Sequence, residues 1–152
     1  MGLLTEALEQ AEQANEELRE LAHGLLPSVL TRGGLTAGVE SLVARVRLPV
    51  TVEVTEQRFA PVIEASAYFV VAEALTNVAK HSGAASADVR LWVDDSALHV
   101  EVRDDGAGGA RPDGSGLLGL SDRLTALGGD LRVDSPPGQG TRIAATLPLR
   151  QG

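Results

Sequence analysis

The sequence predicts an α+β domain in which helices are layered on a mixed, largely antiparallel sheet. Three observations carry this prediction: one long apolar helical stretch, two hairpins of short β-rich runs, and a further alternating run near residue 50. With 152 residues, 43% of them apolar, the chain is long enough to bury a core of its own.

The first expected element is an N-terminal helix over residues 3–26, whose end is marked by Gly24 and Pro27. Apolar or small side chains recur on it every three or four residues and form a narrow seam. A seam this narrow favours pairing with a partner helix, although packing on its own domain is the alternative. The seam residues are Leu4, Ala7, Ala11, Ala14, Leu18, Leu21 and Leu25.

The remaining elements are expected in a fixed order, and each is bounded by turn residues or by a change of hydrophobic period. Pro61 suits the first turn of a helix that is apolar on nearly all sides and is therefore expected to be central. The expected elements are a turn at 32–34, a helix over 35–46, a strand over 49–54, the long helix from 61 to about 81, a hairpin of strands 87–93 and 97–102, a helix over 117–127, and a hairpin of strands 131–134 and 141–147.

Charge and composition exclude several classes of function. The formal charge of −8 argues against a nucleic-acid binder, because neutralising phosphates needs a basic face. The absence of cysteine excludes thiol catalysis and zinc–thiolate sites, and it is compatible with a reducing compartment. No apolar run is expected to reach the roughly 20 residues of a membrane span, so a cytoplasmic chain without membrane contact is predicted.

The long helix carries polar residues that need an explanation. Glu73 and Asn77 lie one turn apart, with Lys80 and His81 a further turn along, so these side chains can face one place. Asn77 offers an oxygen ligand for Mg²⁺, Lys80 a charge for phosphate, and Glu73 a group that could orient a water or accept a proton. A polar face that is merely solvated gives the same spacing.

An acidic, glycine-containing turn, Asp104-Asp-Gly-Ala-Gly108, follows the second strand of the first hairpin. Asp104 can accept a hydrogen bond from an exocyclic amine such as that of adenine, whereas guanine would present a carbonyl acceptor there. Gly106 and Gly108 allow positive φ and close approach of a ligand to the backbone. An ordinary loop remains the alternative, and the ligand spacing of an EF-hand is absent.

The segment Gly114-Ser-Gly-Leu-Leu-Gly119 satisfies the dinucleotide pattern GxGxxG, but no βαβ unit surrounds it. A phosphate-binding loop of the GxxxxGK[ST] type is also absent. The glycines instead open the helix over 117–127, where backbone N–H groups can meet a phosphate tail and Ser115 can add a hydroxyl.

Taken together and in this order, the blocks resemble the ATP-binding domain of sensor histidine kinases, within the wider family of gyrase B, Hsp90 and MutL ATPases. Glu73–His81 resembles the family's N box, Asp104–Gly108 its first glycine box and Gly114–Leu124 its second, in the GxGLxG form of the nitrate-sensor and desaturase-regulator type. Gly138–Thr141, which runs into residues 143–148, resembles the strand that ends this domain. The resemblance covers roughly residues 16–149.

The resemblance implies a Bergerat-type two-layer α/β sandwich that binds ATP and Mg²⁺. Residues 1–30 would be the end of a dimerisation and phosphotransfer helix, residues 31–150 the kinase domain, and residues 108–114 a short ATP lid. Glu73 and Lys80 would be the catalytic residues and Asn77 the Mg²⁺ ligand. The implied ATP-binding residues are Asn77, Lys80, His81, Asp104, Gly106, Gly108, Ser115, Gly116, Leu117, Gly119 and Thr141.

The implied activity is transfer of the ATP γ-phosphoryl group to a histidine on a dimerisation helix, for relay to a response-regulator aspartate. The helix that bears this acceptor is absent from the sequence, and His23 lies on the wrong helix to replace it. The parent kinase would be a homodimer and could be membrane-anchored. Two alternatives stay open: an anti-sigma-factor serine kinase of the same fold, and a scaffold that only dimerises through residues 3–26.

Overall fold

A computed structural model describes residues 28–109 and 115–149; the side chains of residues 81, 82, 115 and 116 are excepted. The predicted N-terminal helix and its seam therefore lie outside the described residues. The helices are α2 (Ser28–Val43), α3 (Pro61–Asn77), the π-helical turn η1 (Val78–Ser82) and α4 (Ser115–Ala126). The strands are β1 (Val50–Val54), β2 (Ala87–Asp94), β3 (Ala97–Asp104), β4 (Asp130–Asp134) and β5 (Thr141–Pro148).

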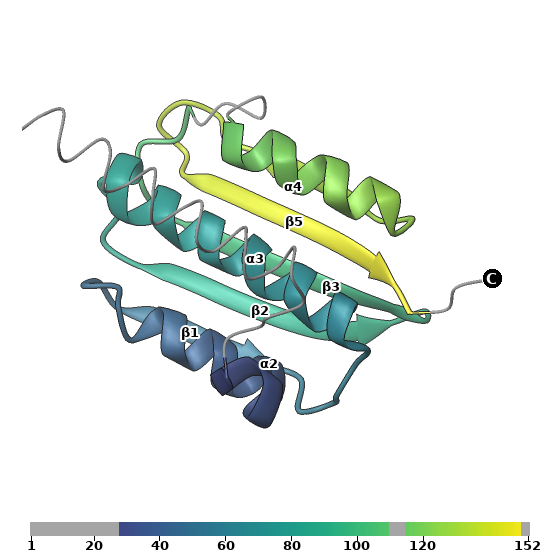
Figure 1. Cartoon of the computed structure of the whole chain (residues 1–152). Coiled ribbons are helices and arrows are strands. Elements are labelled where there is room, and N and C mark those ends of the chain that lie inside the picture. Colours follow the sequence, from purple (N-terminus) through teal and green to yellow (C-terminus); the bar gives the residue numbers. More distant parts are fainter. Residues whose placement is uncertain (1–27, 110–114, 150–152) are drawn as a thin grey trace, which may run out of the picture.

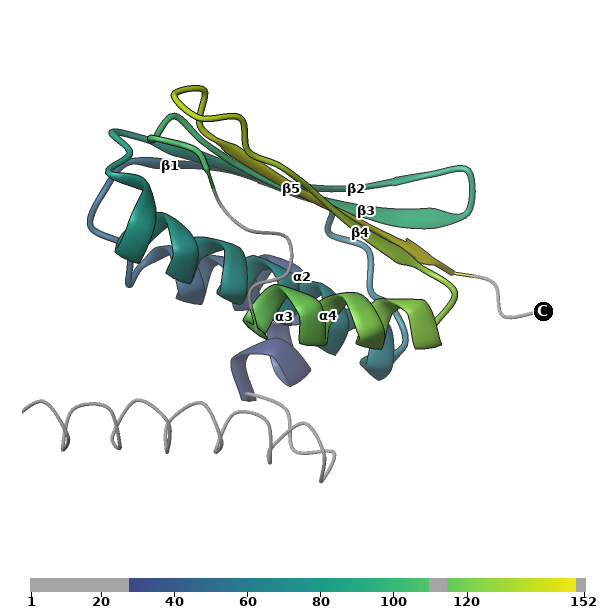
Figure 2. The same cartoon turned by 90° about the horizontal axis from the view of Figure 1, so that it is seen from above.

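The described part of the chain forms two layers, which confirms the predicted α+β class. Helices α2, α3 and α4 lie on one face of a five-stranded sheet with the strand order β1-β2-β3-β5-β4 (Figures 1 and 2). β1 pairs with β2 in parallel, and the other pairs are antiparallel. The sheet is therefore mixed and largely antiparallel, as predicted.

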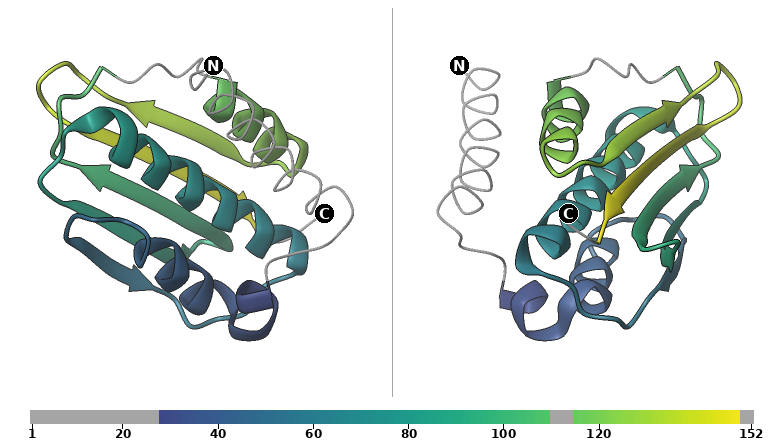
Figure 3. Two further views of the ribbon diagram at one scale, coloured as in Figure 1. Left: turned by 60° about the vertical axis from the view of Figure 1, so that its left-hand side comes forward. Right: turned by 90° about the vertical axis from the view of Figure 1, so that its right-hand side faces the viewer.

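The core lies between the two layers because each strand alternates apolar and polar side chains. On β3, Leu98, Val100 and Val102 are at most 2% exposed, and α3 covers them with a nearly continuous apolar surface. The opposite face of the sheet carries polar side chains, and no described helix covers it (Figure 3). The ends and edges of the sandwich are therefore the parts at which loops and helix termini meet.

Three local features differ from the sequence prediction. The turn expected at residues 32–34 is instead a kink inside α2, where Gly34 has φ 71° and ψ −162°. The long helix ends as the π-helical turn η1, which closes at Gly83 in the left-handed conformation. α4 begins at Ser115 rather than at residue 117, so that Ser115 and Gly116 belong to its first turn.

The expectation that no apolar segment reaches the length of a membrane span also needs correction. Pro61–Lys80 is long and apolar enough by length and composition alone, with a mean hydropathy of 1.3. However, 61% of that window is buried inside the domain. Helix α3 therefore meets the criterion as the core helix of a folded domain.

Candidate nucleotide site

The predicted site residues gather at one end of the sandwich. At this end α3 gives way to η1, β3 ends, and β5 and α4 begin (left side of Figure 1). Pairing across the sheet places Asp104, the last residue of β3, opposite Thr141 on one side and opposite Ala87 on the other. Ala87 and Thr141, which lie 54 positions apart in the sequence, are thus brought to the same end of the sheet.

Helix α3 brings Glu73 and Asn77 to this end, and both side chains are half-buried. Ala74 and Leu75, which lie between them in sequence, are 1% and 3% exposed and hold the helix against the sheet. The polar pair therefore lies along the flank of a firmly packed helix. Lys80 follows in η1 and is exposed. The side chain of His81 lies outside the described part.

The π-helical turn matters because it changes the direction in which the residues after Asn77 project. A π-type turn adds one residue to the helical ring, and such turns are frequent at functional sites. Val78 is 4% exposed and anchors the start of η1, while Gly83 has φ 61° and ends it. The local sequence gives no sign of this turn.

Asp104 and Asp105 are adjacent in sequence but have different surroundings. Oδ1 of Asp105 accepts the backbone N–H groups of Ala85 and Ser86 at 2.8 and 3.0 Å, and Oδ2 accepts the hydroxyl of Ser86 at 3.1 Å. These bonds, the Ser86 backbone bond most, hold the pKa of Asp105 below its usual value. Asp104 is half-buried, and its Oδ1 accepts the N–H of Gly106 at 2.8 Å. Asp105 thus ties two loops together, while the second carboxylate oxygen of Asp104 can accept a ligand donor.

The glycine-rich turn after Asp105 is packed against the turn that precedes β5. Gly109 N–H donates to the Ser135 carbonyl at 2.8 Å, and Gly138 N–H donates to the Ala107 carbonyl at 2.6 Å. Gly108 has φ 71°, and a Cβ there would overlap the carbonyl oxygen of Pro136. Glycine is required at this position by both backbone conformation and close approach. The positive φ of Gly108 confirms the sequence prediction, whereas its close packing against the turn before β5 was not predicted.

The turn before β5 also involves Thr141, another predicted ATP-binding residue. Its hydroxyl lies 2.7 Å from the hydroxyl of Ser135 and is half-buried. A Cβ at Gly140 would overlap the carbonyl oxygen of Asp104, so the start of β5 lies directly against the end of β3. Thr141 therefore supports the loop that carries Asp104.

The start of α4 completes this end of the domain. Leu117 is 4% exposed and belongs to the core, whereas Gly119 is exposed with open space around its Cα. The guanidinium carbon of Arg123 lies 5.9 Å from the centre of the Phe69 ring, which links α4 to α3. Leu117 can offer a ligand only its backbone, and Gly119 leaves the helix surface open. Residues 110–114 and the side chain of Ser115 lie outside the described part.

The oxygen atoms that this end of the domain offers suit a metal ion whose other ligands are substrate phosphates and water. Within residues 28–109 and 115–149, no group of three or more acidic or histidine side chains is placed to bind a metal. Mg²⁺ commonly takes one or two protein oxygens, several waters and substrate phosphates. The half-buried carboxamide of Asn77 meets that limited requirement.

A hollow of about 310 Å³ lies elsewhere, on the polar face of the sheet. Trp92 and His99 stack there with ring centres 5.2 Å apart, and Arg132 and Arg142 lie beside them. The described lining contains none of the predicted site residues. Arg142 is bound to Glu101 at 2.9 Å, so its guanidinium is already engaged.

Comparison with known families decides the assignment. Residues 63–151 match the family described as histidine kinase-, DNA gyrase B- and HSP90-like ATPase. The chain belongs to this family. The match includes α3, the Asp104 turn, α4 and β5, and it implies that this ATPase domain binds ATP.

Individual relatives of this ATPase domain are sensor kinases. The chain is 35% identical to sensor histidine kinase NarS of Mycobacterium tuberculosis over 95% of its own length and 36% of that protein. It is 31% identical to sensor histidine kinase LiaS of Bacillus subtilis over 91% of its own length and 41% of that protein. The chain therefore spans well under half of these relatives.

Solved structures share the fold. The histidine kinase domain of a blue-light-activated kinase from Erythrobacter litoralis matches with a TM-score of 0.65 at 22% identity, covering 76% of this chain and 59% of that one. Acinetobacter baumannii histidine kinase AdeS matches with a TM-score of 0.64 at 14% identity, covering 97% and 81%. These similarities confirm the predicted two-layer architecture of a histidine kinase ATPase domain.

Proposed function

We propose that the chain is the ATP-binding catalytic domain of a sensor histidine kinase. The observation that carries the proposal is the convergence of Asn77, Asp104 and the start of α4 at one end of a domain of the ATPase family. The names of the relatives support the same activity. Transfer would break the bond between the γ-phosphorus and the bridging oxygen of ATP, form a bond from phosphorus to a histidine nitrogen, and release ADP.

Recognition of the base would rest on Asp104. Its half-buried carboxylate is fixed at the end of β3 by the Gly106 N–H, so it is held ready to accept the exocyclic amine of adenine. Guanine has a carbonyl at the same position, and two acceptors would then face each other. Gly108 keeps the adjoining loop close to the Ser135–Gly140 turn.

The phosphates would lie between η1 and the start of α4. Lys80 supplies a positive charge, and the first turn of α4 supplies backbone N–H groups. Residues assigned to this part of the site are Lys80, His81, Ser115, Gly116, Leu117 and Gly119, with Gly106, Gly108 and Thr141 supporting the loop beside Asp104.

Asn77 would hold Mg²⁺ through its carboxamide oxygen, and the bound cation would neutralise charge on the phosphates. Glu73, one turn earlier on the same flank of α3, would orient the reacting group or accept its proton. Positioning and charge neutralisation do most of the work in phosphoryl transfer. Because transfer needs a correctly positioned acceptor, residues 1–152 on their own should bind ATP with little turnover.

The partners follow from this activity. Residues 1–30 would belong to a dimerisation and phosphotransfer helix and residues 31–150 to the kinase domain, in a homodimeric, cytoplasmic or membrane-anchored parent. The phosphoryl group would pass to a response-regulator aspartate. Leu30 of α2 is fully buried in the described core, so the boundary between the dimerisation helix and the kinase domain would lie close to the start of α2.

The first test is isothermal titration of the chain with ATP and with GTP, with and without Mg²⁺. We expect ATP to bind and GTP to bind at least about tenfold more weakly, which corresponds to about 1.4 kcal/mol. Equal affinity for both would contradict the Asp104 assignment. Incubation with labelled ATP and either a histidine-bearing dimerisation module or an anti-anti-sigma protein then separates a histidine kinase from a serine kinase.

A further inference from the structure

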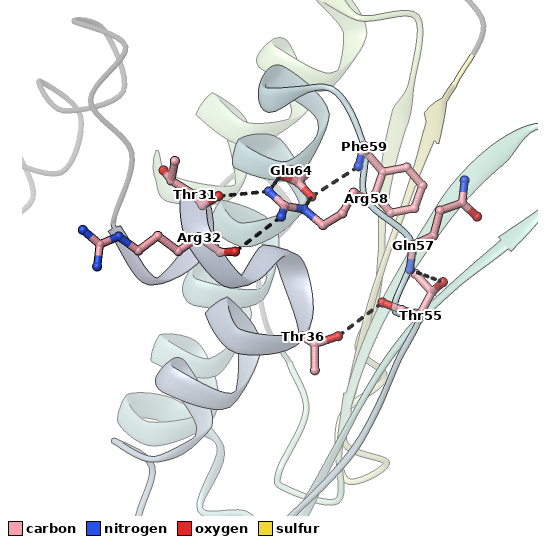
Figure 4. Close-up of polar contacts among 8 residues, drawn as sticks. All are labelled: Thr31, Arg32, Thr36, Thr55, Gln57, Arg58, Phe59 and Glu64. Atoms are coloured by element: carbon pink, nitrogen blue, oxygen red, sulfur yellow. Dashed lines mark hydrogen bonds and ion pairs between the residues drawn. The ribbon is translucent and has the colours of Figure 1, made fainter.

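The guanidinium of Arg58 joins three segments at the end of α3 opposite to the nucleotide site (Figure 4). Its Nε lies 2.9 Å from Oε2 of Glu64, and its Nη2 donates to Oε1 at 3.3 Å. Nη2 also donates to the carbonyl of Thr31 at 3.0 Å, and Nη1 makes a longer contact of 3.5 Å with the carbonyl of Arg32. One side chain thus connects the loop before α3, the first turn of α3 and the first turns of α2.

The carboxylate partner is buried in the domain. The side chain of Glu64 is 4% exposed, and Oε2 also accepts the backbone N–H of Phe59 at 3.3 Å. A buried carboxylate must be paired, and such a pair adds little stability compared with apolar side chains of similar volume. The two hydrogen bonds between the guanidinium and the carboxylate instead fix the relative orientation of the two side chains. The hydrogen bonds and the charge of Glu64 raise the pKa of Arg58 further, so the guanidinium stays charged.

The kink in α2 is built around this side chain. Gly34 has φ 71° and ψ −162°, a combination that is essentially restricted to glycine. A Cβ at Gly34 would lie 2.6 Å from Cδ and 2.8 Å from Nε of Arg58. The kink turns residues 28–33 away from the rest of α2, and Arg58 then holds their carbonyls. The direction of this segment is therefore set by the Gly34 backbone and the Arg58 fork together.

Helix α3 connects this fork to the nucleotide site. Glu64 lies in its first turn and Asn77 is its last residue, about 20 Å apart along a continuous helix. Ten residues of α3 are buried, so the helix is held firmly on the sheet. A segment tied to Glu64 is consequently fixed relative to Asn77 and Glu73.

We propose that Arg58 is a positioning residue for phosphoryl transfer. By tying residues 28–33 to the start of α3, it sets the direction from which the preceding phosphoacceptor module approaches the γ-phosphate at the other end of that helix. This inference rests on the proposed histidine kinase function. Misplacement by about 1 Å can lower such a rate by about 100-fold. ATP binding should change little, because residues 28–33 are tied to the end of α3 opposite to Asn77.

Arg58→Lys is the informative variant. A lysine ammonium can pair with Glu64, but as a point charge it cannot hold both carboxylate oxygens and the two carbonyls at once. In the full-length kinase, we expect autophosphorylation to slow by about 10- to 100-fold while the Kd for ATP changes less than about twofold. Arg132→Lys, which makes the same change in the exposed pair with Asp130 at 3.2 Å, is the matched control and should leave both quantities unchanged.

A second variant keeps the test valid if Arg58→Lys does not fold. Glu64→Gln preserves the shape of the partner but leaves Arg58 a single acceptor oxygen, and it should show the same selective loss; thermal melting verifies folding of both. An unchanged rate, or a rate and an ATP affinity that fall together, would overturn the positioning role. A wild-type kinase that binds ATP but phosphorylates no histidine would instead remove the proposed function, and this inference with it.

Discussion

Asp105 accepts two hydrogen bonds from Ser86, one from the backbone N–H at 3.0 Å and one from the hydroxyl at 3.1 Å. With a third bond from the Ala85 N–H, its carboxylate fixes the loop before β2 to the turn after β3. The neighbouring Asp104 is thereby held in place at the edge of the predicted site. We propose that the two adjacent acids have different roles: Asp105 supports the loop, and Asp104 accepts a hydrogen bond from the ligand.

This division predicts a pH dependence of stability. Because the folded pKa of Asp105 lies below its usual value of 3.8, its contribution is complete above about pH 5 and is lost as the pH falls through 3.8 toward the folded pKa. Asp105→Asn should lower the melting temperature at pH 7, and the difference from the wild type should shrink near pH 3. Asp88→Asn, on the exposed side of β2, is the control and should show no such convergence.

The two acids should also differ in their effect on ATP. Asp104→Asn replaces a charged acceptor by a carboxamide that can present a donor, and hydrogen bonds to charged groups contribute about 1.5–3 kcal/mol. We expect ATP affinity to fall by about tenfold or more with little change in melting temperature. Asp105→Asn should lower the melting temperature more than the affinity. Isothermal titration with ATP and thermal melting of both variants test this. A loss of affinity in Asp105→Asn and a loss of stability in Asp104→Asn would show that the two roles are reversed.

Sequence periodicity sufficed for most of the fold because the pattern of burial is local. The strands show alternation, and α3 shows a continuous apolar surface, so each element could be predicted from a short window. The first turns of α2 were missed because Gly33 and Gly34 are typical turn residues. The structure instead places a kink at Gly34 inside the helix, where Arg58, 24 residues away in the sequence, packs against Gly34.

The sequence predicted which residues belong to the site, but not the contacts that hold them in place. The sequence singled out Asp104, but it could not show that Asp105 binds the loop of the distant residues 85–86. The Arg58–Glu64 pair was missed altogether. A usable signal existed, because Glu64 is a lone carboxylate at the start of an apolar helix and such a group needs a partner when buried.

Substitutions in the glycine turn can measure the cost of steric overlap separately from the cost of backbone strain. Gly108 and Gly109 both have positive φ, but only Gly108 has a carbonyl oxygen where a Cβ would go; around Gly109 there is open space. Gly109→Ala should cost about 1 kcal/mol from backbone strain alone. Gly108→Ala should cost about 2 kcal/mol or more, because the Pro136 carbonyl must also move. Denaturant unfolding of the two variants measures the difference, and equal costs would show that the turn yields freely.

The β2–β3 hairpin offers a stabilising change far from the site. Asp95 and Ser96 form its two-residue turn with φ values of 50° and 64°, although neither is glycine. Turns of this kind prefer Asn-Gly because both central residues need positive φ. Replacing Asp95-Ser96 by Asn-Gly should raise stability by about 0.5–1 kcal/mol and leave ATP affinity unchanged. A loss of stability would mean that the side chains contribute contacts that outweigh the relief of strain.

Asn77 provides the test of the metal assignment. If its carboxamide holds Mg²⁺, Asn77→Ala should reduce ATP affinity in the presence of Mg²⁺ and leave the weaker binding measured in EDTA nearly unchanged, because only the cation contact is removed. Thr76→Ala is a suitable neighbouring control, since the Thr76 hydroxyl is exposed and bonds back to the Ala72 carbonyl at 2.8 Å. Titration with ATP in the presence and absence of Mg²⁺ gives the coupling free energy between Mg²⁺ and ATP binding for each protein. We expect that coupling to vanish in Asn77→Ala and to persist in Thr76→Ala; an unchanged coupling in Asn77→Ala would place the cation on other oxygens of the site.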